Sequence, residues 1–486
     1  NVVLIVVDTL RADALRAEAP GTPGLDALAD DALVFPRAFA HAPMTLPSHA
    51  ALFSSRLPHA TGVVNNGQAV PADLPLLSDW IARDGYVTRA VVSLGTLWGT
   101  APGTSVDRGF DTYDTRGGLM PRAPTTQARL ERVVDELDPA RPFFLFAHFS
   151  DPHEPYNAHS GPERLADLVW NGAPLATVTT SDMTTWNGEV ELLPGANRLE
   201  IAAPDEFFVR HLECRRAGRP LPWTFEEGAL RRDGRRLVAV VRGGADETAR
   251  VELDLWIHDV PDEAERLRRY REEVAFVDRA VAALVLRLRE RGLLDESILV
   301  LTSDHGEALG ERGSWGHVET LMDELLHVPL LVRLPPGHPA ERRLRARTRD
   351  LVRHVDVVPT LLELLGLPPL PGQTGVSLLH DSERVLVAET HRPEATRDRI
   401  CLRDGRYKLV HVPPDAATGA PEAFEMYDLR EDPGELRDVY ATRGGERREW
   451  EATLRALHAA YAASARGEAG DEVELGRLRA LGYARD

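Results

Sequence analysis

The chain opens on an uninterrupted apolar run that ends in a carboxylate. Val2–Val7 contains only valine, leucine and isoleucine, and Asp8 follows directly. A run without polar residues predicts a strand buried on both faces, which is typical of a parallel sheet covered by helices. Two further apolar runs, at residues 142–149 and 297–302, also lead into polar loops. The sequence therefore predicts an α/β fold with a mostly parallel sheet flanked by helices.

The polar residues after these strands predict a metal site. The carboxyl ends of parallel strands share one edge of a sheet, so the side chains there can converge. Carboxylates and imidazoles without cysteine suit a divalent cation such as Zn²⁺, Mn²⁺, Mg²⁺ or Ca²⁺, with one or two ions. Taken singly, such an aspartate is usually a cap or turn residue, and such a histidine usually satisfies a carbonyl. The candidates are Asp8, Asp151, His153, Asp304, His305 and the downstream His317.

Composition excludes some classes of partner. The 486 residues include 57 basic and 76 acidic side chains, a net charge of −19, which argues against nucleic acid as a general partner. Cys214 and Cys401 are not in ligand spacing, and two unpaired buried thiols are favoured over one disulfide. No apolar run is long enough to span a bilayer. The chain begins on a strand without Met, which we interpret as a trimmed leader.

The middle of the chain has a different texture. Residues 166–259 alternate between polar and apolar and contain the turn pairs Asn187-Gly188, Pro194-Gly195 and Asp233-Gly234, which predicts an inserted, β-sandwich-like antiparallel unit. Residues 1–165 and 260–380 are then the catalytic core. Residues 381–486 are a small C-terminal α+β subdomain. Within the core we expect helices at 263–291, 321–326 and 354–368, and a loop at 107–114.

Seven segments, in order, resemble the sulfatase family of the alkaline phosphatase superfamily. They are VVDTLRAD, TLPSH with RLPHATGV, DPHEPY, TSDHGEALGERG, WGHVETLMDELLHVPLLV, HVDVVPTLLELLG, and LRDGRYKLV with YDLREDPGEL. The resemblance covers nearly the whole chain except the insertion. It implies an alkaline-phosphatase-like core, ester hydrolysis, and a periplasmic or secreted location.

The resemblance also assigns roles to residues. It implies that Asp8, Asp304 and His305 bind the primary metal and that Thr45 is the nucleophile and also touches that metal. His153 and His317 would face the leaving group. Together with Asp151 they would form a second, Asp/His/His metal site. The helix start at Thr45 would add amide donors for an anion.

Position 45 departs from the sulfatase pattern. The family motif is C/S-x-P-x-R, whose first residue becomes formylglycine, whereas this chain has Thr45 and, in place of the arginine, His49. Threonine would oxidise to a ketone and not to an aldehyde, so formylglycine is excluded. Thr9 likewise replaces a second aspartate. These changes resemble the threonine-nucleophile branches, namely nucleotide pyrophosphatase/phosphodiesterases and phosphoethanolamine transferases. His49 would either contact the phosphoryl oxygens or cap its helix.

The leading hypothesis is a metal-dependent phosphoester hydrolase acting on a phosphodiester or phosphomonoester. The substrate would be a small-molecule, glycan or lipid-headgroup ester. The alternatives are a sulfuric ester hydrolase without formylglycine, a phosphoethanolamine-type transferase, and a degenerate glycan-binding member. The sequence is less informative about three other residues. Arg11 either contacts the anion or forms a surface salt bridge, and Lys408 either approaches the site or is exposed. His59 is expected to hold its own loop together.

Overall fold

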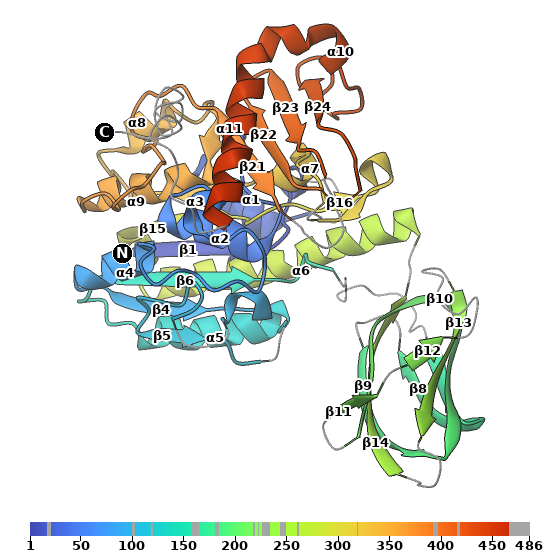
Figure 1. Cartoon of the computed structure of the whole chain (residues 1–486). Coiled ribbons are helices and arrows are strands. Elements are labelled where there is room, and N and C mark those ends of the chain that lie inside the picture. The colour runs from blue at the N-terminus through green and yellow to red at the C-terminus, as the bar shows by residue number, and fades with distance from the viewer. Residues whose placement is uncertain are drawn as a thin grey trace. The chain divides into compact units, whose positions relative to one another are not determined.

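The computed structural model divides into two compact units (Figure 1), Asn1–His153 with Val274–Asp486, and Glu154–Glu273. The predicted boundaries at 166–259 and 381–486 stay predictions. Pro155, residues 466–486 and the side chains of Trp186, Trp223 and Trp256 lie outside what the structure describes. It describes residues 1–16, 21–99, 103–117, 120–154, 156, 165–179, 184–216, 219–221, 223–225, 234–243, 249–259, 262–317, 319–391, 397–415 and 418–465.

The first unit is built on a seven-stranded sheet. Its strand order is β2-β19-β15-β1-β6-β4-β5, and β15, β1, β6, β4 and β5 run parallel, as predicted. β19 pairs antiparallel with β15 and β2. The strands are β1 (Val2–Val7), β2 (Leu33–Val34), β4 (Val87–Val91), β5 (Thr112–Asp114), β6 (Phe143–Phe149), β15 (Ile298–Thr302) and β19 (Leu330–Arg333).

The register of the three central strands aligns their carboxyl ends. Val7 pairs with Phe149 of β6, and Val6 pairs with Thr302 of β15. Asp8, Ser150 and Ser303 are therefore the first residues beyond one common edge. This alignment is what the apolar runs predicted.

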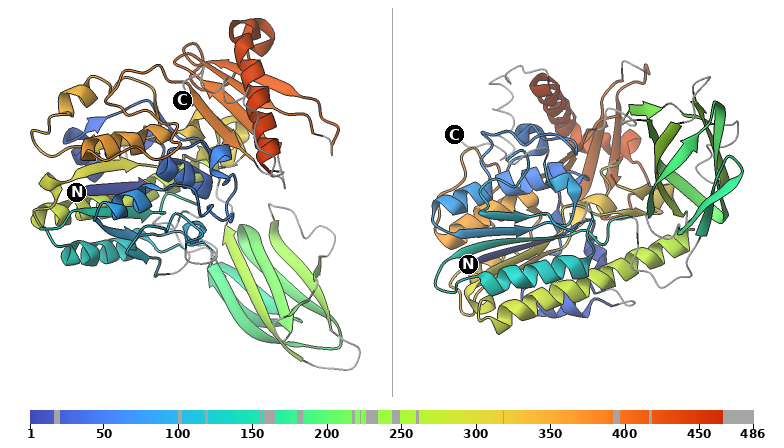
Figure 2. Two further views of the ribbon diagram at one scale, coloured as in Figure 1. Left: turned by 60° about the vertical axis from the view of Figure 1, so that its left-hand side comes forward. Right: turned by 90° about the horizontal axis from the view of Figure 1, so that it is seen from below.

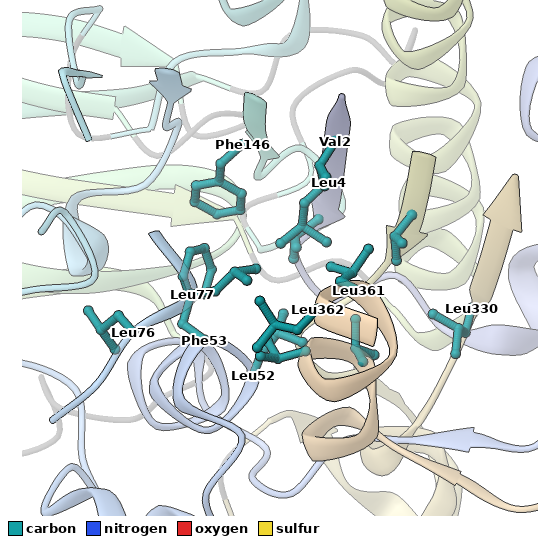
Figure 3. Close-up of a cluster of buried hydrophobic side chains, with 14 of the residues drawn as sticks. Val2, Leu4, Leu52, Phe53, Leu76, Leu77, Phe146, Leu330, Leu361 and Leu362 are labelled. Carbon is teal, nitrogen blue, oxygen red and sulfur yellow. The ribbon is translucent and has the colours of Figure 1, made fainter. Parts of the chain in front are cut away.

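Helices cover both faces of this sheet. On one face, Val2, Leu4 and Phe146 of the sheet pack against Leu52 and Phe53, and against leucines of two further helices (Figure 3). These helices are α2 (Thr45–Ser54), α4 (Leu77–Arg83) and α9 (Val357–Leu365).

The opposite face carries α1, α5 and the later part of α6 (Figure 2). Asp278 of α6 caps α1 by accepting hydrogen bonds from the amides of Gly24 and Leu25, at 3.1 and 2.6 Å. Arg287 of α6 pairs with Asp135 of α5 at 2.5 Å. The helices are α1 (Pro23–Asp30), α5 (Ala123–Glu136) and α6 (Glu263–Glu290).

Three local predictions in the core were wrong. The expected loop at 107–114 contains β5, because residues 112–114 pair in parallel with β4. The helix expected at 354–368 ends at Leu365, because Gly366 takes a φ of 70° and closes it. Its first turn is a separate 3₁₀ helix, His354–Asp356. The helix expected at 321–326 is only α7 (Asp323–Leu326).

The second unit is antiparallel, as the alternating pattern predicted. Eight strands form one hydrogen-bonded sheet in which the long β10 pairs with β13 and β7 through its first half and with β14 and β11 through its second. The strands are β7 (Leu165–Trp170), β8 (Ala173–Thr179), β9 (Thr184–Leu192), β10 (Gly195–Arg216), β11 (Arg219–Leu221), β12 (Trp223–Phe225), β13 (Gly234–Gly243) and β14 (Ala249–Asp259).

One predicted turn of this unit is a strand. Asn187-Gly188 lies inside β9, where the pair faces Asp254 and Leu253 of β14. The ladder to β14 therefore overrides the local turn preference. The Asn-Gly turn of this unit is instead Asn171-Gly172, whose φ values of 50° and 80° connect β7 to β8. Gly195, with a φ of 88°, starts β10 after the predicted Pro194 turn.

The C-terminal part of the first unit is a four-stranded antiparallel sheet in the order β21-β22-β23-β24, packed against α11. Cys401 of β22 and Cys214 are buried and unpaired, as predicted. No helix in the described part of the chain combines the length and apolar character needed to cross a bilayer. The elements are β21 (Leu386–Thr390), β22 (Arg399–Arg403), β23 (Tyr407–Val412), β24 (Ala423–Asp428) and α11 (Arg448–Ala465).

The packing of α9 on the sheet gives a stability prediction. Leu361 is 1% exposed within the core cluster, whereas Leu436 is 75% exposed. We expect Leu361→Ala to lower the free energy of unfolding by about 2–5 kcal/mol, because it removes buried methyl groups and leaves a cavity. We expect Leu436→Ala to change it by less than about 0.5 kcal/mol. Urea unfolding followed by circular dichroism measures both, and equal effects would contradict the assigned core.

Candidate active site

Two neighbouring strands, β1 and β15, bring a compact group of possible ligand atoms together. Asp8 follows β1, and Asp304 and His305 follow β15. All three side chains are fully buried, and one ligand atom from each lies within 4.8 Å of the others. His305 Nε2 lies 3.7 Å from Asp8 Oδ1 and 3.5 Å from Asp304 Oδ2.

Hydrogen bonds to the backbone orient two of these residues. His305 Nδ1 donates to the Gly306 carbonyl at 2.9 Å, so the proton is on Nδ1 and the Nε2 lone pair is left for a ligand. Asp304 Oδ1 accepts from the amides of His305 and Thr9, at 2.9 and 3.3 Å. The other carboxylate oxygen, Oδ2, is therefore the one that faces His305 Nε2.

The amide of Thr9 comes from a strained backbone. Thr9 has a φ of 55°, a left-handed conformation that is rare for a β-branched residue. Such a conformation costs on the order of 1–3 kcal/mol and persists only where the surroundings enforce it. Here it turns the chain directly after Asp8 and brings the Thr9 amide to Asp304.

The donor set fits a divalent cation. Both oxygens of Asp8, Asp304 Oδ2 and His305 Nε2 are buried and have no hydrogen-bond partner within the described residues. Among those same residues, no lysine or arginine pairs with either aspartate. Burying an uncompensated carboxylate is costly, so a cation bound here would remove the largest unfavourable term. Oxygen and imidazole donors without sulfur suit Zn²⁺, Mn²⁺, Mg²⁺ or Ca²⁺.

The pKa values show the same charge conflict. Burial raises the pKa of the Asp8 carboxyl well above its usual range, and the adjacent Asp304 charge raises it further. Burial acts on Asp304 in the same direction, but His305, His49 and His148 outweigh it, so the pKa of that carboxyl is lowered. Two neighbouring carboxyls shifted in opposite directions indicate that the site does not hold two negative charges side by side without a cation.

Thr45 is the first residue of α2, and two contacts tie this helix to Asp304. Ser48 Oγ donates to the Asp304 carbonyl at 2.6 Å. His49 Nδ1 donates to the Thr45 carbonyl at 2.8 Å and lies 3.6 Å from Asp304 Oδ2. Thr45 itself is 1% exposed. The start of α2 is thus fixed against the backbone that carries Asp304 and His305.

The approach to α2 is set by a small sheet. β3 (Ala38–Phe39) lies between β18 (His327–Val328) and β20 (Val352–Arg353), which hold the chain just before the segment that starts at Thr45.

The first turn of α2 has fewer free backbone amides than an ordinary helix start. The Leu46 amide donates to Asn66 Oδ1 at 2.9 Å, and Pro47 has no N–H. Fewer amides are therefore available at this helix start to bind an anion than we expected.

His49 lies on the inner side of α2. Its side chain is fully buried, and its ring centroid is 5.2 Å from that of His148 and 6.0 Å from that of Phe146, both on β6. Its bond to Thr45 lies within the helix, and the role of His49, phosphoryl contact or helix cap, stays a prediction.

Two histidines extend the group away from Asp8. The hairpin of β16 (Ala308–Leu309) and β17 (Trp315–Gly316) places Glu307 and His317 on either side of its open end. The ring of His317 is 4.6 Å from that of His305 and 4.9 Å from that of His153. The structure thus groups both predicted leaving-group histidines with His305.

Asp151 has a different environment. Its Oδ1 accepts from the Ala123 amide at 2.7 Å, at the start of α5, and burial raises the pKa of this carboxyl to about 6. Within the described residues, Asp8, Asp304 and His305 make up the one set of three that meets the spacing for a metal. A second ion held by Asp151, His153 and His317 therefore stays a prediction.

Three other candidate residues lie outside this group. Arg11 forms salt bridges with Asp13 and Glu311 at 2.6 Å each. Of its two expected roles, these contacts match the salt bridge and not the contact with an anion. Lys408 is neither at the site nor exposed: it is fully buried and contacts Asp323 and Glu435 at 2.6 Å each.

His59 holds the segment after α2 in place, as predicted. Its Nδ1 and its amide both lie within hydrogen-bond distance of Glu389 Oε1, at 2.8 and 2.9 Å. The other oxygen of Glu389 bonds His391 Nε2 at 2.8 Å, and His391 stacks on Tyr461 of α11. Glu389 thereby connects the segment after α2, which contains His59, to the C-terminal sheet and to α11.

Sequence reasoning missed two residues of the site. Glu307 accepts a bond from His317, and Ser48 bonds the Asp304 backbone. Glu307 stands within the TSDHGE segment, so its place two residues after His305 was the available signal. Nothing in the local pattern distinguishes Ser48 from a helix-cap serine.

Comparison with known proteins identifies the family. A model described as sulfatase matches residues 1–367, and one for the C-terminal part of N-sulphoglucosamine sulphohydrolase matches residues 310–457. The fold is a mixed α/β fold of the alkaline phosphatase type. The chain belongs to the sulfatase family, as predicted, and is an enzyme of the hydrolase class.

Named relatives agree with this assignment. The choline-sulfatase of Rhizobium meliloti (strain 1021) is 24% identical over 477 residues, which cover 90% of this chain and 82% of that protein. A solved 2-O GAG sulfatase has a TM-score of 0.62 at 18% identity, covering 97% of this chain and 94% of its own. The phosphonate monoester hydrolase of Agrobacterium radiobacter has a TM-score of 0.61 at 21% identity, covering 95% and 96%. These two structures share the fold.

The ligand group predicts stabilisation by metal. We expect Mn²⁺ or Zn²⁺ at about a hundred times its dissociation constant to raise the free energy of unfolding by about 2.7 kcal/mol, because the ion binds only the folded site. Asp304→Asn should abolish this gain. Asp111→Asn, which alters a carboxylate outside the group, should retain it. Unfolding after chelation and after metal addition measures the effect, and an equal gain in Asp304→Asn would contradict the site.

The Glu389 connection predicts a pH dependence. Burial alone would lower the pKa of His391, but Asp398 and Glu389 raise it to about 9. The unfolded pKa is about 6.5, so the resulting stability is complete below that pH and is lost as pH rises through 9. We expect the excess stability of wild type over His391→Gln to shrink by about 3 kcal/mol between pH 6 and pH 9.5. Denaturant titrations at both pH values test this, and a constant difference would refute it.

Proposed function

We propose that the chain is a metal-dependent hydrolase of phosphoesters, either phosphodiesters or phosphomonoesters, with Thr45 as the nucleophile. The observation that carries the proposal is a threonine at the first residue of α2, in a helix tied to Asp304 by Ser48 and His49. Threonine has a hydroxyl that can accept a phosphoryl group, but oxidation cannot give it the aldehyde of formylglycine. The alcohol part of the substrate is a small molecule, a glycan or a lipid headgroup.

Each residue then has a defined role. Asp8, Asp304 and His305 would hold a divalent cation, which when bound lowers the pKa of a contacting hydroxyl and offsets charge on the transferred group. The Thr45 hydroxyl gives up its proton to solvent, and Oγ attacks phosphorus as the bond from phosphorus to the leaving oxygen breaks. This gives phosphothreonine from a monoester, or an ester of phosphothreonine from a diester. His317 or His153 supplies the proton that the leaving oxygen takes up. Water then attacks phosphorus and releases Thr45.

Two observations support phosphorus chemistry. The phosphonate monoester hydrolase of Agrobacterium radiobacter has a similar fold over 95% of this chain. The imidazoles of His153 and His317 lie close to each other, and that of His317 lies close to His305, which supports a role in protonating a leaving oxygen of high basicity.

A second candidate is sulfate ester hydrolysis without formylglycine. It is favoured by the choline-sulfatase relative, which aligns over 90% of this chain. In that case Thr45 would attack sulfur, and the same ligand set would serve. Relative rates on aryl phosphorus and aryl sulfate esters separate the two candidates.

Removal of the nucleophile gives the decisive test. We expect Thr45→Ala to lower kcat/KM for bis(p-nitrophenyl) phosphate by at least about 10³-fold, because no covalent route remains. Thr45→Ser should retain measurable turnover. Ser54→Ala, in the same helix but bonded only to the Ala50 carbonyl among the described residues, should change it by less than about twofold. Steady-state rates with Mn²⁺ and Zn²⁺ measure these effects.

Mass spectrometry of acid-quenched reactions adds a direct readout. With bis(p-nitrophenyl) phosphate, wild type should gain the mass of one p-nitrophenyl phosphoryl group on the peptide containing Thr45, and Thr45→Ala should not. Full activity in Thr45→Ala would overturn the nucleophile. Faster turnover of p-nitrophenyl sulfate than of any phosphorus ester would favour the second candidate.

A further inference from the structure

Glu307 is a buried carboxylate beside the site to which the proposed mechanism gives no role. It is fully buried, and its Oε1 lies 3.1 Å from Nδ1 of His317. A carboxylate oxygen accepts hydrogen bonds, so His317 Nδ1 carries the proton in this contact. The acid and the imidazole therefore form a directed pair.

The backbone of Glu307 is anchored on both sides. The Gly306 amide donates to the Leu325 carbonyl at 2.8 Å, and Arg11 Nη1 donates to the Glu307 carbonyl at 3.1 Å. A side chain at Gly306 would approach the Glu324 carbonyl to 2.1 Å, so the chain passes closely there. Glu307 is thus held in a fixed position.

His317 is the less constrained member of the pair. It follows β17 directly, and its side chain is 14% exposed, against 0% for Glu307. The pairing of Ala308 with Gly316 brings the two residues to the open end of the hairpin. The hydrogen bond at Nδ1 sets both the rotation of the ring and its tautomer. Contact with a substrate must then use Nε2.

We propose that Glu307 is a positioning residue that holds His317 with Nδ1 protonated and Nε2 presented to the oxygen of the leaving alcohol. The inference rests on the proposed ester hydrolysis and deepens it. In the step concerned, the bond from phosphorus to the leaving oxygen breaks, and that oxygen takes the proton from His317 Nε2. The Nδ1 proton stays on the ring, hydrogen-bonded to Glu307, so His317 leaves the step as a neutral imidazole.

The dependence on the leaving group tests this role. A poor leaving group needs the proton, whereas p-nitrophenolate departs without it. We expect Glu307→Ala to lower kcat for diphenyl phosphate by about 10²-fold, and for bis(p-nitrophenyl) phosphate by less than about fivefold. Glu307→Gln, which keeps an acceptor for Nδ1, should recover part of the loss. In a His317→Ala background, Glu307→Ala should have no further effect on the leaving-group dependence.

Glu311→Gln serves as the matched control. Glu311 lies in the same loop, but it pairs with Arg11 and accepts from the Leu309 amide. Its substitution should affect both esters equally. An equal fall for both esters in Glu307→Ala would show a merely structural role and overturn the inference, as would the absence of any fall.

A spectroscopic readout is independent of activity. Nitrogen-15 NMR of histidine-labelled protein, with His317 assigned from the His317→Ala variant, reports which ring nitrogen carries the proton. We expect a protonated Nδ1 in wild type and a shift of this signal in Glu307→Ala. An unchanged signal would overturn the inference. If wild type hydrolyses none of the phosphorus or sulfate esters, the proposed function fails, and the role of His317 as proton donor fails with it. The NMR result still decides whether Glu307 holds His317 with Nδ1 protonated.

Discussion

The structure depends on the burial of two carboxylates at the end of a parallel sheet. Asp8 and Asp304 are placed in a region without solvent or, among the described residues, a lysine or arginine partner. Such an arrangement is unfavourable unless positive charge enters. Much of the neighbouring structure serves to keep the pair in position: the bond from Ser48 to the Asp304 carbonyl, the amides at Asp304 Oδ1, and the carbonyl that fixes the tautomer of His305.

The sheet and the helices on its faces have complementary roles in this arrangement. The sheet sets the register, so that β1, β6 and β15 end together. The apolar face below supplies the free energy that offsets the polar cost at the edge, through the leucines and phenylalanines of α2, α4 and α9. Because α2 both packs on this face and starts with Thr45, the position of Thr45 is set by the same contacts that form the core.

The convergence of Asp8, Asp304 and His305 was predictable from sequence because the strands that precede them are easily identified. Apolar runs such as Val2–Val7 have few alternatives to a buried strand, and the residue at the end of such a strand has a fixed place. Features that depend on long-range pairing were less accessible. β5 has a loop-like composition and is a strand only because β4 lies beside it, and Asn187-Gly188 is extended because β14 pairs with it. The contact of Glu307 with His317 is set by a hairpin that the local pattern did not reveal.

The conformation of Thr9 has a consequence for how this enzyme can change. A φ of 55° is easy for glycine and hard for a β-branched residue, so a change of the Thr9 backbone to a negative φ would relieve strain and raise the stability of the fold. The same relaxation would release the amide that holds Asp304 in place. At Thr9, the backbone conformation that would make the fold more stable is therefore not the one that keeps the Asp304 carboxylate in position. Selection for thermal tolerance alone would be expected to erode activity there first.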